Sequence, residues 1–79
     1  MDRDQQEQKK FLEEQVEWCK HQDAILEKIE KNLYEMKEIA KYVREHWLTL
    51  LEMDKLNDQL NTLKQEVKFL EQELHSDFH

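Results

Sequence analysis

Residues 12–50 read LEEQVEWCKHQDAILEKIEKNLYEMKEIAKYVREHWLTL, and the apolar side chains in this stretch recur with a period of seven. One row, which we call the a row, is apolar at every step: Leu12, Cys19, Leu26, Leu33, Ala40 and Trp47. A second row three residues further on, the d row, is apolar at four of its six steps: Gln15, Gln22, Ile29, Met36, Val43 and Leu50. Such a heptad repeat predicts an all-α coiled coil, in which long helices associate along a shared apolar seam.

A third row widens this seam. The g row, one residue before each a position, is also largely apolar: Phe11, Trp18, Ile25, Asn32, Ile39 and His46. A strict a/d stripe suits a two-stranded coil, whereas a wider stripe suits packing against more than one partner helix. We therefore expect residues 9–52 to form a helix with a wide a/d/g apolar face. The possible interface with another protein consists of the apolar g residues Phe11, Trp18, Ile25 and Ile39, for which the alternative is ordinary bundle core.

Residues 53–76 repeat the heptad more narrowly. Leucines, one methionine and one valine occupy two rows here, and the residues beside these rows are polar. In a parallel homodimer Glu66 would face Glu71 of the other chain, so the charge pattern gives that arrangement no support. Taken along the whole chain, the predicted oligomer seam is Leu12, Cys19, Leu26, Ile29, Leu33, Met36, Ala40, Val43, Trp47, Leu50, Leu56, Leu60, Leu63, Val67, Leu70 and Leu74.

Two architectures are compatible with these two repeats. The first, which we favour, is a single continuous helix of roughly 115 Å at 1.5 Å per residue, because the chain contains no glycine or proline to end it. The second is a helical hairpin that turns near residues 52–58, where aspartate and asparagine are frequent, and pairs into a bundle. Folding about Lys55 would set Val43 against Val67. In either case residues 1–8 are expected to be a polar arm and residues 77–79 a frayed tail.

Composition limits the classes of function. The chain has 79 residues, of which 39% are charged, and a net charge of −7. Nucleic-acid binding requires a basic surface, so it is not expected. No apolar run is long enough to span a bilayer and the first ten residues are polar, so we expect neither a membrane span nor a secretion signal. The single cysteine, Cys19, fits a core position and a cytoplasmic location.

No constellation of residues predicts catalysis, a cofactor, a metal or a small-molecule substrate. Cys19 and His21 are two apart on a helix and do not share a face, and His75 and His79 lack a third ligand. The carboxylates lie on helix faces that cannot enclose a desolvated pocket. We expect a non-catalytic interaction module that self-associates, as a homodimer or higher oligomer, and acts as a coiled-coil scaffold or adaptor for another helical protein. The alternative is a small acidic helical regulator that binds a helical partner and inhibits or modulates it.

Overall fold

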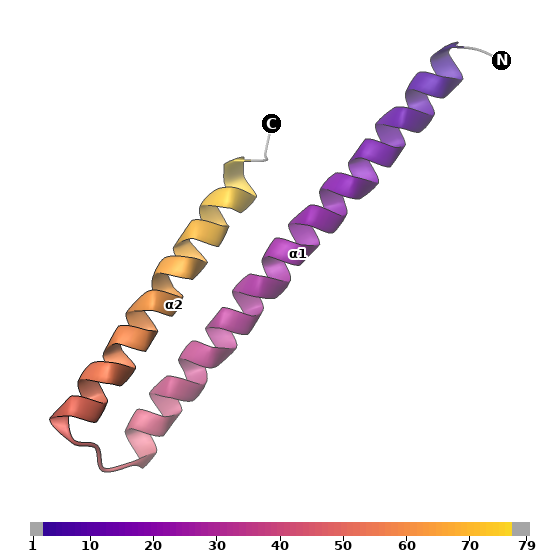
Figure 1. Cartoon of the computed structure of the whole chain (residues 1–79). Coiled ribbons are helices and arrows are strands. Elements are labelled where there is room, and N and C mark those ends of the chain that lie inside the picture. The colour runs from indigo at the N-terminus through magenta and orange to yellow at the C-terminus, as the bar shows by residue number, and fades with distance from the viewer. Residues whose placement is uncertain (1–2, 77–79) are drawn as a thin grey trace.

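The computed structural model describes residues 3–76, which form two antiparallel α-helices joined by a short turn (Figure 1). Helix α1 spans Arg3–Glu45 and helix α2 spans Leu50–Ser76. The hairpin measures 71 × 19 × 12 Å along its principal axes. The expected all-α class is confirmed, and residues 3–8 of the expected polar arm belong to α1. Residues 1–2 and the expected frayed tail, 77–79, lie outside the described residues.

The favoured single continuous helix is not what forms, and the hairpin turns at residues 46–49, before the expected 52–58. The reason is a capping box at the start of α2. The Thr49 hydroxyl accepts a hydrogen bond from the Glu52 backbone N–H at 3.1 Å, and the Glu52 carboxylate accepts one from the Thr49 N–H at 3.5 Å. Met53 N–H donates to the Thr49 carbonyl at 3.0 Å, which begins the helical hydrogen-bond ladder. A threonine and a glutamate thus start a helix where glycine and proline are absent.

The other side of the turn ends α1 with an aromatic pair. The Tyr42 carbonyl accepts hydrogen bonds from the His46 backbone N–H at 3.1 Å and from the His46 ring Nδ1 at 2.9 Å. A carbonyl only accepts, so this contact requires the proton on Nδ1. The His46 ring also stacks on the Tyr42 ring, with centroids 3.9 Å apart. The backbone bond is the ordinary helical bond between residues four apart, and the His46 ring adds a second donor to the same carbonyl at the end of α1.

The helices meet along a seam whose centre is Ile25, Ile29 and Val67. Met36, Leu70 and Leu74 pack against this cluster. Two exposed polar contacts mark the same alignment of the helices. Asn32 Nδ2 donates to Glu66 Oε2 at 2.9 Å, and His21 Nε2 lies 4.0 Å from Glu73 Oε1.

This alignment differs by two heptads from the one expected for a hairpin. Ile29, rather than Val43, shares the core with Val67, and Ile29 lies fourteen residues earlier on the same d row. Val43 instead lines a groove near the turn together with Met53 and Leu60. When the turn moves by about one heptad, the residue of α1 that faces a given residue of α2 moves by two heptads. The heptad repeat places an equivalent apolar residue at that position.

Helix α2 contributes both of its apolar rows to the seam, and its middle is helical despite an unfavourable composition. Asn57, Asp58 and Asn61 are poor helix formers, yet all lie within α2. The Thr62 hydroxyl donates to the Asp58 carbonyl at 3.0 Å, so it adds a bond within the helix instead of competing with it. Tertiary packing of the leucines around these residues decides the local structure.

We expect Thr49→Ala to lower the free energy of unfolding by about 1 kcal/mol, because the first turn of α2 loses its side-chain cap. Urea denaturation followed by circular dichroism measures this difference. Thr62→Ala is the matched control, since it removes an exposed hydroxyl from the middle of the same helix and introduces a better helix former. Equal stability of the two variants would show that the capping box does not hold the turn.

Candidate protein-interaction surface

The face of α1 that packs on α2 consists of the d and g rows. Every residue of α1 that is buried or half-buried belongs to one of them: Gln22, Ile25, Ile29, Asn32, Met36, Ile39 and Val43. These positions alternate in steps of three and four, which is the pattern of one continuous helical seam. Among residues 3–76 no buried side-chain nitrogen or oxygen lacks a hydrogen-bond partner, so the buried Gln22 is tolerated in this seam.

The a row lies outside this seam and is exposed along its whole length. At 100° per residue an a position is about 60° from the d row, on the flank of the helix that α2 does not cover. Leu26 is 44% and Leu33 is 50% exposed, and Trp47 in the turn is fully exposed. The six residues that are apolar at every heptad step therefore form an outer apolar stripe.

The four possible interface residues named from the g row divide into two pairs. Ile25 is only 2% exposed and Ile39 is half-buried, so both belong to the contact between α1 and α2. Phe11 is more than half exposed, and Trp18 is just over one third exposed. The two pairs differ because α2 is shorter than α1 and does not extend as far as Phe11.

Helix α1 has 43 residues and α2 has 27, so α1 extends well beyond the C-terminal end of α2 (Figure 1). Near the end of the paired region His21 of α1 lies 4.0 Å from Glu73 of α2. We call residues 3–17 of α1 the overhang. Its large apolar side chains, Phe11, Leu12 and Val16, are all more than half exposed. The overhang is a second apolar surface, continuous with the a row.

A third exposed apolar group lies at the opposite end of the hairpin. Trp47 in the turn and Leu50 and Leu51 in the first turn of α2 project from the seam, and Leu50 is 82% exposed. Leu48, between them, is half-buried. This group of exposed apolar side chains is a candidate interaction surface.

A row that is charged at four of its five positions borders the a row on the side away from α2. We call it the e row, because its members follow those of the a row by four residues: Val16, Asp23, Glu30, Lys37 and Arg44. All five are exposed. The charges are not mixed along the helix, since the acidic residues come first and the basic residues follow.

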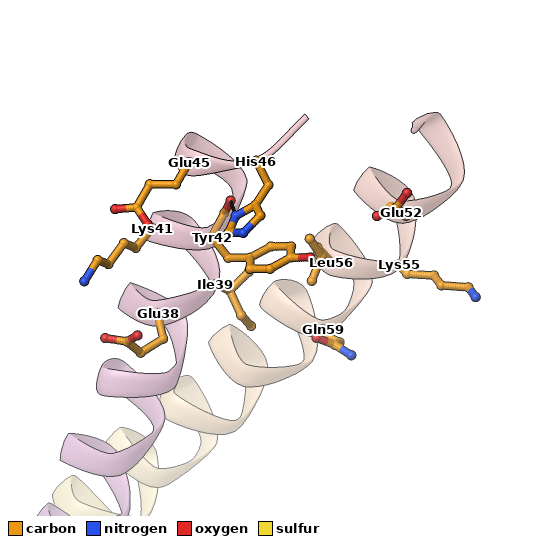
Figure 2. A pocket seen from close by; sticks show the side chains of 10 residues that line it. All are labelled: Glu38, Ile39, Lys41, Tyr42, Glu45, His46, Glu52, Lys55, Leu56 and Gln59. Carbon is orange, nitrogen blue, oxygen red and sulfur yellow. Dashed lines mark hydrogen bonds between the residues drawn. The ribbon is translucent and has the colours of Figure 1, made fainter. Parts of the chain in front are cut away.

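The other side of the hairpin carries an open groove near the turn (Figure 2). The Tyr42 ring reaches from α1 toward Leu56 of α2, whereas the side chains of Lys41 and Lys55 point away from the groove. Its charged groups come from both helices but do not converge on a common point. The groove is thus an edge of the helix contact with an aromatic floor, and it does not resemble a pocket organised for acid-base chemistry.

The described part of the chain contains no group of three or more histidine, cysteine, aspartate or glutamate side chains that could hold a metal ion. Cys19 is exposed on the a row and not part of the hairpin core. Neither α1 nor α2 has a stretch apolar enough to cross a membrane, within the residues described. No protein-family model, curated protein or solved structure matches this chain. The exposed apolar rows are therefore the features of this chain that bear on its function.

Sequence reasoning missed several residues of this surface and of the turn. Val16 and Leu51 are off the predicted seam rows, although both are large and apolar. Thr49 and Glu52 had a recognisable signal, because Thr-x-x-Glu before an apolar run is the signature of a helix start. The signal for Val16 and Leu51 is their spacing, because each follows an apolar a-row residue by four and so extends the apolar stripe.

We expect Ile29→Ala to lower the free energy of unfolding by about 2 kcal/mol, because Ile29 is buried at the centre of the seam. Leu33→Ala is the control, since it removes a similar volume from the exposed a row four residues away. The comparison is made by thermal and urea denaturation at low protein concentration. If Leu33→Ala were the more destabilising variant, the assignment of the d and g rows to the hairpin contact would be wrong.

Proposed function

We propose that this chain is a non-catalytic protein-interaction module that associates with itself through the exposed a row of α1 and serves as a scaffold or adaptor. The observation that carries the proposal is the exposure of that row. A strictly periodic apolar stripe in water lowers the free energy of association with another helix, at about 25 cal/mol for each Å² removed from solvent. The hairpin itself leaves this stripe uncovered, from Leu12 to Trp47.

The width of the apolar face supports a bundle of more than two helices. Helix α1 has three apolar rows, of which α2 covers two. A helix with a face this wide is typical of bundles, where it packs against two neighbours at once. A second neighbour on the a row would complete the bundle, and a second hairpin supplies one.

The overhang favours a second function, that of a small acidic regulator which binds a helical partner. Phe11, Leu12 and Val16 lie beyond the reach of α2, and Leu12 and Val16 share one helix face because they are four residues apart. An amphipathic helix with such anchors binds in the groove of a helical partner, as in helix-in-groove recognition. The two functions are compatible, because an adaptor associates through one surface and binds its client through another.

A cytoplasmic location is part of the proposal. The chain has one cysteine, and its thiol is exposed on the a row. Reducing compartments keep such a thiol free, whereas small secreted domains are commonly rich in paired cysteines. The net charge of −7 supports protein partners over nucleic acid.

We expect the wild-type chain to elute as a concentration-dependent oligomer and Leu33→Asp to elute as a helical monomer. The aspartate places a charge in the middle of the exposed a row, but it does not enter the contact between α1 and α2. Size-exclusion chromatography with light scattering gives the mass, and circular dichroism gives the helicity.

The control for this experiment is Phe69→Asp. Phe69 is also large, apolar and exposed, but it lies on α2 beside the groove of Lys28, Lys31 and Glu66, away from the a row. This variant should keep the wild-type mass. A wild-type chain that remains monomeric at every concentration would exclude self-association and leave the regulator as the remaining proposal.

A further inference from the structure

We infer that the helix that covers the a row is α1 of a second copy, running antiparallel, with a two-fold axis beside Leu33. The inference rests on the proposed self-association and adds its orientation and register. The a row alone does not choose between a parallel and an antiparallel neighbour. Three further features of the exposed surface favour the antiparallel neighbour: the charges of the e row, the sizes of the a-row side chains, and the position of the exposed residues at the turn.

The charges of the e row are self-complementary only in the antiparallel direction. Asp23 and Glu30 precede Lys37 and Arg44 along the helix, and all four are exposed. When two copies of α1 cross antiparallel, Asp23 faces Arg44 and Glu30 faces Lys37 of the other copy. Both pairs are centred on the same point, between residues 33 and 34, and each occurs twice in the dimer. A parallel dimer in register would instead place each of these charges at the same level as its own copy, so no opposite charges of the e row would pair.

The side-chain volumes of the a row are complementary about almost the same point. With the axis at Leu33, that residue meets its own copy, and the other positions pair a large residue with a small one. Leu26 faces Ala40, and Cys19 is level with the turn that carries Trp47. Cores pack at high density when large and small residues oppose each other, so this arrangement leaves room for the Trp47 indole. In a parallel dimer two indoles would compete for one position.

The exposed turn end also gains a neighbour in this register. With the axis at Leu33, the last residue of α1, Glu45, is level with His21 of the other copy, so the overhang of that copy extends past the turn, where Leu50 is 82% exposed. The part of each overhang nearest α2 thus lies beside the apolar cluster at the turn of its partner, at both ends of the dimer. Phe11 and Leu12 project further and stay available to another protein. A four-helix assembly results, with the two α1 helices in contact and α2 on the outer side of each.

The first test reverses charges on the e row. Glu30→Lys and Lys37→Glu each create two like-charge pairs in the antiparallel dimer, and each should raise its dissociation constant roughly tenfold. The double variant Glu30→Lys/Lys37→Glu restores opposite charges and should return the dissociation constant to within about twofold of wild type. Sedimentation equilibrium at low ionic strength measures all four proteins.

Glu38→Lys is the matched control for these variants. It changes the net charge as Glu30→Lys does, but Glu38 lies at the edge of the groove on the other side of α1 (Figure 2). Its dissociation constant should stay at or below the wild-type value. A double variant that is as weak as either single variant would overturn the antiparallel register.

The second test locates the axis with single cysteines in a Cys19→Ser background and a short bismaleimide cross-linker. Leu33→Cys should cross-link to itself, and Leu26→Cys should cross-link to Ala40→Cys when the two proteins are mixed. Leu26→Cys alone should not cross-link, because its two copies are about 21 Å apart along the axis. Dimers in which Leu26→Cys links to itself would overturn the orientation while leaving self-association intact. Monomers in sedimentation would overturn both.

Discussion

The width of the apolar face on α1 is the constraint from which the other features follow. Three adjacent rows of a 43-residue helix are apolar, and one neighbouring helix can cover only two of them. Helix α2 takes the d and g rows, where Ile25 and Ile29 become the centre of a small core. The remaining row is left on the flank with its leucines half exposed. The fold and the exposed apolar stripe are thus two parts of one amphipathic pattern.

The heptad pattern predicted the helical class and the apolar rows, but it could not fix the alignment of the helices. A repeat of seven offers an equivalent partner at every heptad, so the pairing of Val67 with Val43 or with Ile29 satisfies the same rows. Only the turn distinguishes these alternatives. For the same reason the sequence identified three apolar rows without showing which would remain exposed, since that depends on the direction from which α2 approaches.

The turn lies earlier than the composition predicts, because a local capping signal outweighs the absence of glycine and proline. The lack of glycine and proline favours a continuous helix. The asparagines and aspartates of residues 54–61 favour a turn, but in the structure these residues lie in the first half of α2. Thr49 and Glu52 supply the cap that a turn of this kind needs, and His46 completes it from the side of α1. Local side-chain to backbone bonds here outweigh helix propensity summed over the region.

The unequal lengths of the two helices imply a gradient of local stability along the molecule. Near the turn, α1 opens only if its contacts with α2 also break, whereas the overhang opens without breaking any buried contact. A helical segment that lacks tertiary packing is marginal in water and unfolds and refolds on a microsecond scale. Amide hydrogens in residues 3–17 would therefore exchange far faster than those around Ile29. A client that binds the overhang would order a fluctuating helix, and mutations that alter helix propensity there would tune its affinity without touching the interface.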